Sequence, residues 1–129
     1  MNRNPIFCVI VSLMLLSGCS QKPADVAESF VYHIEEGNFE SAVDLFSAQV
    51  IATFGREKLI RGVKRSHTDM LEKGGVDSFM VISEEPSTDG MSIMLEYEIT
   101  FKNGERNSST MDIVKQNGKW KIEPNFGNK

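Results

Sequence analysis

The stretch MSIMLEYEITFKNG, residues 91–104, decides the fold class of this chain. Apolar and polar side chains alternate along it, and the apolar set is Met91, Ile93, Leu95, Tyr97, Ile99 and Phe101. A period of two predicts a strand with one face in a core and the other in solvent. Asn103 and Gly104 then predict a hairpin turn at its end.

Three further strands follow from this one. Residues 76–83 predict a strand before it, and residues 105–115 predict its return partner, with Met111 and Ile113 pointing inward. A second Asn-Gly pair, at 117 and 118, predicts another hairpin turn, after which Trp120 and Ile122 alternate in a fourth strand. The whole is a four-stranded antiparallel meander.

Before residue 76 the apolar period is that of a helix. We expect three helices, at about residues 23–36, 38–50 and 56–73, each with one apolar stripe. Pro23 suits a first turn, Gly37 ends the first helix, Asn38 can cap the second, and Gly74-Gly75 stops the third. Helices that precede a sheet predict an α+β fold, in which three N-terminal helices pack on a curved, cone-like sheet.

The first 18 residues predict an export signal. Arg3 precedes an apolar run from Ile6 to Leu16, which is shorter than the roughly 18 residues of a membrane-spanning helix. The ending Leu16-Ser17-Gly18-Cys19 resembles the lipobox of bacterial lipoproteins. That resemblance implies cleavage before Cys19 and attachment of lipid to its thiol, with fatty-acyl chains such as palmitate.

The predicted cleavage defines the rest of the chain. Cys8 would be lost with residues 1–18, so Cys19 would be the only thiol and no intramolecular disulfide could form. Ser20 follows where an Asp would resemble an inner-membrane retention signal, which implies sorting to the outer membrane, facing the periplasm. We divide the chain into a signal (1–18), a lipidated linker (19–23), a cone-like domain (24–123) and a tail (124–129).

Charge excludes one class of partner. After cleavage, 13 basic residues face 18 acidic ones, a net charge of −5 in 111 residues. Such a domain has no general attraction for nucleic acid or anionic headgroups, so its hold on the membrane depends on the lipid at Cys19.

The segment EEGNFESAVDLF (residues 35–46), the third helix and the ending NGKWKI (117–122) resemble the cystatin-like cone of the nuclear transport factor two-like superfamily. The resemblance covers about residues 24–122 and is greatest to small bacterial lipoproteins without an assigned function. This superfamily includes enzymes, ligand carriers and protein-binding domains, so the resemblance implies a fold and leaves the function open.

Candidate functional residues are few. His67 falls near the centre of the stripe formed by Leu59, Val63 and Met70, where a histidine could act as a base; a satisfied core or rim residue is the simpler interpretation. His33 lies at the edge of the first helix's stripe and suits a surface role. The sequence has no metal-ligand spacing, phosphate loop or serine elbow, so we expect no cofactor and no metal.

Methionines and one basic face remain. Met70 and Tyr97 could line a pocket, and Met94 interrupts the polar side of its strand, which could mark a contact on that face of the sheet. Lys58, Arg61 and Arg65 share one helix face, which is either solvated, with a pair such as Arg65 and Asp69, or a contact patch for an acidic partner.

The leading hypothesis is therefore a membrane-anchored lipoprotein of the cell envelope that is not an enzyme. It would bind either an envelope protein or a small apolar ligand. The alternative is a ketosteroid isomerase-like or SnoaL-like enzyme that uses His67, an activity implied by the family resemblance.

Overall fold

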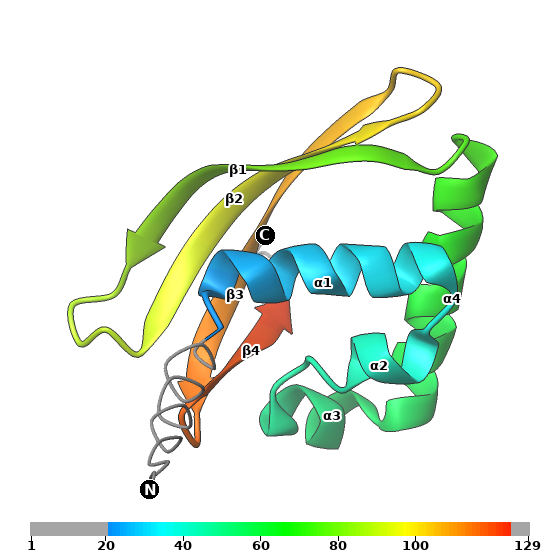
Figure 1. The fold of residues 1–129 in the computed structure, drawn as a ribbon. Helices are drawn as coiled ribbons and strands as arrows, with labels where there is room; N and C mark the ends of the chain where they lie inside the picture. Colours follow the sequence, from blue (N-terminus) through cyan, green and yellow to red (C-terminus); the bar gives the residue numbers. More distant parts are fainter. Residues whose placement is uncertain (1–20, 125–129) are drawn as a thin grey trace, which may run out of the picture.

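The computed structural model describes residues 21–124 and confirms the α+β fold class (Figure 1). The elements, in chain order, are α1 (Pro23–Glu36), α2 (Phe39–Val43), α3 (Ala48–Phe54), α4 (Arg56–Glu72), β1 (Val76–Pro86), β2 (Ser92–Phe101), β3 (Arg106–Gln116) and β4 (Lys119–Pro124). The predicted signal, Cys19 and the tail after Pro124 lie outside the described residues.

Helix α1 begins and ends as its sequence predicts. Pro23 is its first residue, and the backbone N–H of Lys22 donates to the Asp25 carboxylate at 3.4 Å. Gly37 ends it in the left-handed conformation, with a φ of 81°, so that its N–H bonds the Ile34 carbonyl at 3.1 Å.

The second predicted helix, residues 38–50, is wrong as one piece: it is α2 and α3, separated by an extended connection. Phe46 pairs with Ile122 in an isolated parallel bridge, and the Ser47 N–H donates to the Ile122 carbonyl at 3.0 Å. The Ser47 hydroxyl then accepts from the Val50 N–H at 3.2 Å and caps α3. The helix ends in a turn at Asp44 and Leu45, after which the backbone of Leu45 and Ser47 bonds to Ile122 of the last strand instead.

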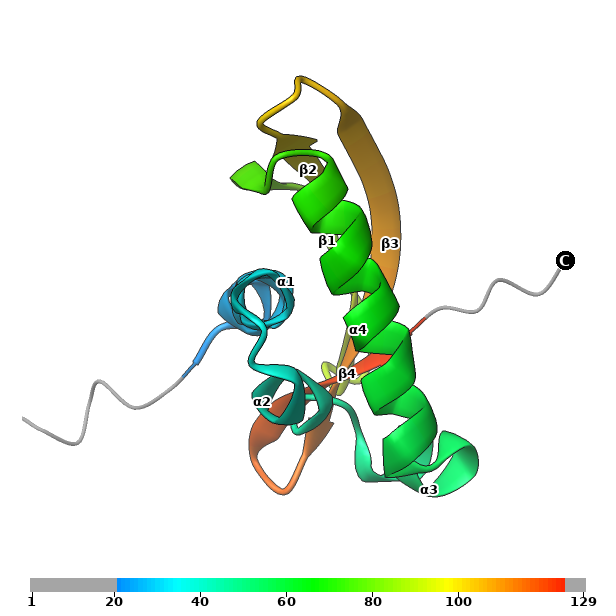
Figure 2. The ribbon, with the colours of Figure 1, turned by 90° about the vertical axis from the view of Figure 1, so that its right-hand side faces the viewer.

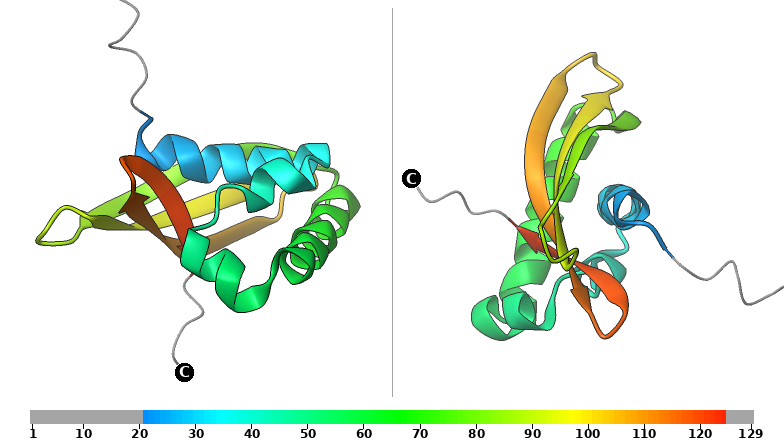
Figure 3. Two further views of the ribbon diagram at one scale, coloured as in Figure 1. Left: turned by 90° about the horizontal axis from the view of Figure 1, so that it is seen from below. Right: turned by 90° about the vertical axis from the view of Figure 1, so that its left-hand side faces the viewer.

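The strands form one antiparallel sheet in the order β1-β2-β3-β4. Asn117 and Gly118 both have positive φ, as a two-residue type I′ turn requires, and they join β3 to β4. The register of β1 on β2 shifts between Val81 and Ser83, which adds local twist. Figure 3 shows the sheet curving with the helices on its concave side.

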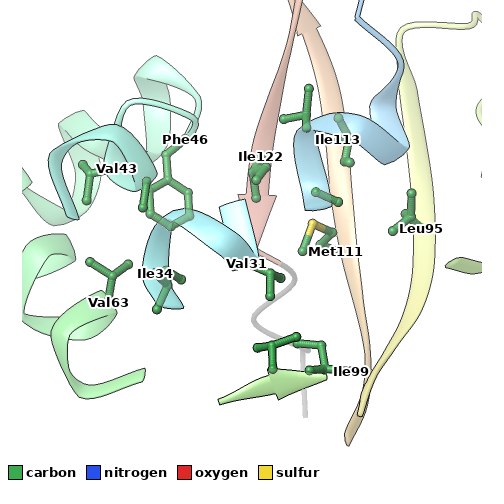
Figure 4. Close-up of a cluster of buried hydrophobic side chains, with 14 of the residues drawn as sticks. Val31, Ile34, Val43, Phe46, Val63, Leu95, Ile99, Met111, Ile113 and Ile122 are labelled. Carbon is green, nitrogen blue, oxygen red and sulfur yellow. The ribbon is translucent and has the colours of Figure 1, made fainter. Parts of the chain in front are cut away.

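The core lies between α1 and the concave face of the sheet. The cluster includes Val31 of α1, Leu95 and Ile99 of β2 and Ile113 of β3, and Ile34 of α1 lies on its helical side near Val43 and Val63 (Figure 4). Every buried hydrophobic residue of the described chain lies between Val26 and Ile122.

Met91 corrects the predicted inner face of the central strand. Its side chain is 50% exposed and precedes β2, whose first residue is Ser92. Met91 instead belongs to the β1–β2 turn, where its N–H donates to the Asp89 carboxylate at 3.0 Å. Leu95, Ile99 and Phe101 are buried as the alternation predicts.

Candidate ligand-binding cleft

Helix α4 stands beside the sheet instead of lying flat on it. It packs against α1, α2 and α3. Figure 2 shows α4 running along the strands, with α1 seen end-on to one side. Between α4 and strands β2 and β3 lies a cavity of about 610 Å³, and a narrower one of about 190 Å³ adjoins it.

Three residues line both cavities: Ser66 of α4, Tyr97 of β2 and Ser109 of β3. We therefore treat the two as the wide and narrow parts of one α4–sheet cleft. The apolar side chains of the wide part are Phe30, Ile34, Phe46, Phe54, Leu59, Val63, Met111 and Ile122. Met70, Ile99 and Phe101 line the narrow part. Mostly apolar walls with a few polar groups are typical of small-molecule sites.

Tyr97 supplies the polar group at the junction of the two parts. Its ring stacks on Phe79 of β1, with the ring centres 5.5 Å apart and the planes at 24°. Its phenol bonds the side chain of Ser109, its partner on β3. Burial raises the pKa of the Tyr97 phenol above its ordinary value, and the Ser109 bond opposes that rise. The phenol is therefore neutral at physiological pH.

The α4 side of the cleft carries the charge. Lys58 lines the wide part, and its ammonium lies 5.7 Å from the centre of the Phe54 ring. Asp69 lines the narrow part and pairs with Lys73 at 3.6 Å. This pair replaces the predicted contact of Asp69 with Arg65.

His67 does not line either part of the cleft. Its Nδ1 lies 2.8 Å from the Ile34 carbonyl oxygen, and its ring meets Phe39 edge-on at 5.2 Å. These contacts join α4 to the end of α1 and the start of α2. They give His67 the geometry of a satisfied rim residue, the simpler of its two interpretations.

The other predicted site residues, Met70, Met94 and His33, lie in three different places. Met70 is buried at the floor of the narrow part, beside Tyr97. Met94 lies on the opposite face of the sheet and is 40% exposed. It sits in a hollow of about 380 Å³ with Glu85, Asp112 and Glu123. His33 lies with Tyr32 in a shallow groove along α1.

The sequence analysis does not predict the polar residues of the cleft other than Tyr97: Lys58, which it places on a basic face, Ser66, Asp69, Asn107, Ser109 and Thr110. The signal for Ser109 was present, because the alternation of Met111 and Ile113 extends back to it and to Asn107. Within residues 21–124, no helix is long and apolar enough to cross a membrane. The same residues hold no group of three or more side chains suited to bind a metal.

Residues 17–123 match a family described as a domain of unknown function, DUF4878. The chain belongs to the DUF4878 family. No curated protein matches its sequence.

Among solved structures, a Campylobacter jejuni protein provisionally named an NTF2-like transpeptidase superposes with a TM-score of 0.70 at 20% identity, over 79% of this chain and 97% of its own. This DUF4878 chain therefore has the NTF2-like fold. The protein Aln2 from a Streptomyces species gives a TM-score of 0.46 at 12% identity, over 77% of this chain and 81% of Aln2. The intermembrane region of the chloroplast protein ARC6 gives 0.41 at 13%, over 80% and 94%.

Proposed function

We propose that this protein is a lipid-anchored protein of the cell envelope that binds a small, largely apolar ligand in the α4–sheet cleft without catalysis. The observation that carries the proposal is the cleft itself. Its wide part, of about 610 Å³, lies within the roughly 300–1,000 Å³ of ligand sites, and most of its lining side chains are apolar.

The anchor rests on the first 19 residues. Arg3, the apolar run and Leu16-Ser17-Gly18-Cys19 support lipidation of Cys19 and a place in the outer membrane, facing the periplasm. Helix α1 begins at Pro23, four residues after Cys19, and four extended residues reach about 14 Å at most. The domain would therefore sit close to the membrane surface, where an apolar ligand is abundant.

A non-catalytic role fits the polar groups of the cleft. Apart from Lys58 and Asp69 they are hydroxyls and one amide: Ser66, Tyr97, Asn107, Ser109 and Thr110. An acid–base enzyme of the alternative kind would need a titratable pair that faces the substrate. His67 instead points to the Ile34 carbonyl, and Asp69 pairs with Lys73. The transpeptidase name of the Campylobacter protein has no matching histidine-activated nucleophile in this cleft.

A substitution at Gly62 tests the proposal. Gly62 lines the wide part, and a Cβ at this position would meet no other heavy atom within 4 Å. Gly62→Trp should therefore fill the cleft while the core stays intact. Lys64→Trp, on another face of α4 and outside the lining of the cleft, is the matched control.

The measurement is native mass spectrometry of protein extracted gently from its host's membranes. We expect a bound small molecule on the wild-type chain and on Lys64→Trp, and none on Gly62→Trp. A small molecule that is retained equally by Gly62→Trp would contradict the cleft as its site. Cys19→Ser, in the same preparation, should leave the membrane fraction.

A second candidate is a protein partner on the outer face of the sheet. Met80 (55% exposed), Ile82 (47%) and Met94 (40%) support it, because large apolar side chains are exposed there. Met94→Lys should release a stoichiometric protein partner if this face is the interface. If the partner stays bound to that variant, this candidate is wrong.

A further inference from the structure

We propose that the ligand of the α4–sheet cleft carries one anionic group, held at Lys58, and an apolar body that extends along α4 toward Met70. This inference rests on the proposed function and names the chemical class of its ligand. Its basis is the distribution of charge and of apolar surface along the cleft.

The wide part has a single charged lining side chain, the ammonium of Lys58. No carboxylate forms a salt bridge with Lys58 within residues 21–124. Its ammonium lies near the Phe54 ring, beside an apolar wall. A cation so placed, without a neutralising partner in the described chain, favours a negative group on the ligand.

Two further basic side chains lie near Lys58 on α4. Arg61 and Arg65 are exposed on the same face of α4 as Lys58, and neither forms a salt bridge with another residue in the described part of the chain. Arg56, by contrast, is held by Glu40 and Asp44, each at 2.6 Å. Of these three unpaired basic residues, Lys58 is the one that lines the wide part.

The narrow part has the opposite charge. Its one charged lining side chain is Asp69, and the ammonium near it, that of Lys73, is shared with Glu105, also at 3.6 Å. An anion is therefore repelled from the narrow part and attracted to the wide part. This difference fixes the direction in which an anionic ligand lies.

The apolar surface between the two charges is long. Lys58 and Asp69 are separated by 11 helical positions, which span about 16 Å at 1.5 Å per residue. Leu59, Val63 and Met70 lie along this length of α4. An extended acyl chain matches such a groove. Tyr97 and Ser109, midway along it, could bond a hydroxyl or ester oxygen of the chain.

The test uses residues 20–129, which contain every buried hydrophobic residue of the described chain, and it requires a cooperative thermal melt as evidence that this fragment folds. The probes share one chain length: dodecanoate, dodecyl phosphate, dodecanol and dodecyltrimethylammonium. The three charged probes are titrated below their micelle concentrations and dodecanol below its solubility limit, by calorimetry. Dodecanoate and dodecyl phosphate distinguish a free fatty acid from a lipid phosphate as the source of the anion.

The variants are Lys58→Gln and its matched control Lys64→Gln. Lys64 is an exposed lysine of the same helix, 5.8 Å from the Phe39 ring centre, and it does not line the cleft. Lys58→Gln should weaken an anionic probe about tenfold, the usual effect of losing one hydrogen bond to a charged group. Dodecanol binding should be unchanged, and Lys64→Gln should change neither.

Three results would overturn the inference while the cleft stays a ligand site. These are an equal loss of dodecanol and dodecanoate in Lys58→Gln, no loss of either, or tighter binding of dodecyltrimethylammonium than of both anions by the wild-type chain. If none of the four probes binds the folded wild-type chain, the proposed function itself fails.

Discussion

Helices α1 and α4 lie beside the same sheet but use it differently. Helix α1 buries Val26, Ala27, Val31 and Ile34 in its 14 residues, whereas α4 buries only Val63 and Met70 in its 17. The first is mainly a structural element: most of its apolar face is buried in the core, although Phe30 and Ile34 also border the cleft. The second is held by other helices, and part of its apolar face lines an open cleft. Amphipathic helices can therefore serve stability or binding according to what faces them.

The largest expected effect is on the free energy of unfolding, which should fall more for a truncation in α1 than for one in α4. Ile34→Ala removes a side chain that is 3% exposed, and Leu/Ile→Ala changes in cores cost about 2–5 kcal/mol. Leu59→Ala, on the cleft side of α4, should cost less than about 1 kcal/mol, because Leu59 is only half-buried. Urea denaturation measures both free energies of unfolding. Equal losses would break the comparison.

The next effect concerns His67, which connects α4 to α1 and α2. His67→Gln should lower the free energy of unfolding by about 1–2 kcal/mol, since it removes the bond to the Ile34 carbonyl and the contact with Phe39. Ligand binding should be unchanged when measured well below the melting temperature. A loss of ligand turnover without a change in melting would instead support the enzymatic alternative.

Substitutions of one glycine in α4 and one at the end of α1 should change stability in opposite directions. Gly62 lies inside α4 with an ordinary φ and open space around it, so Gly62→Ala should stabilise the protein by about 0.5–1 kcal/mol. Gly37→Ala, at the end of α1, should destabilise it because the φ of 81° disfavours a side chain. Thermal melting of the two variants would show opposite shifts, and shifts of the same sign would contradict this account.

The smallest effect depends on pH. Burial raises the pKa of Tyr97 in the folded state above the unfolded value of about 10. The neutral phenol therefore contributes fully to stability below about pH 10. That contribution falls as the pH rises from about 10 toward the folded-state pKa. Wild-type protein should therefore lose more stability than Tyr97→Phe above about pH 10. The check is unfolding at pH 7 and pH 11 for each chain. Parallel losses would mean that Tyr97 ionises as freely as in the unfolded chain.

Much of the sheet could be predicted because its signals are local. Alternation identifies β2 through Leu95, Ile99 and Phe101, and Asn117-Gly118 identifies the last turn. The break at Ser47 could not be predicted, since its cause is Ile122, far away in the chain. The helical spacing of apolar residues continues through the connection, from Val43 to Phe46 and Val50, and therefore predicts one continuous helix.

The cleft was less predictable than the fold. Periodicity shows which face of α4 is apolar, but not whether that face meets strands, helices or empty space. His67 illustrates this point: it lies on the apolar stripe near Met70, yet it faces α1 and α2 while Met70 reaches the cleft. The distance between α4 and the sheet depends on α1, α2 and α3 together.

The bridge between Phe46 and Ile122 has a consequence for how the chain matures. Its two residues are 76 positions apart, and Ile122 also donates its N–H to the Leu45 carbonyl at 2.8 Å. Contacts of such separation form late and slow the folding of a domain. The connection between α2 and α3 has no partner until almost the whole polypeptide is available. During synthesis, this connection can therefore close only after β4 has been made.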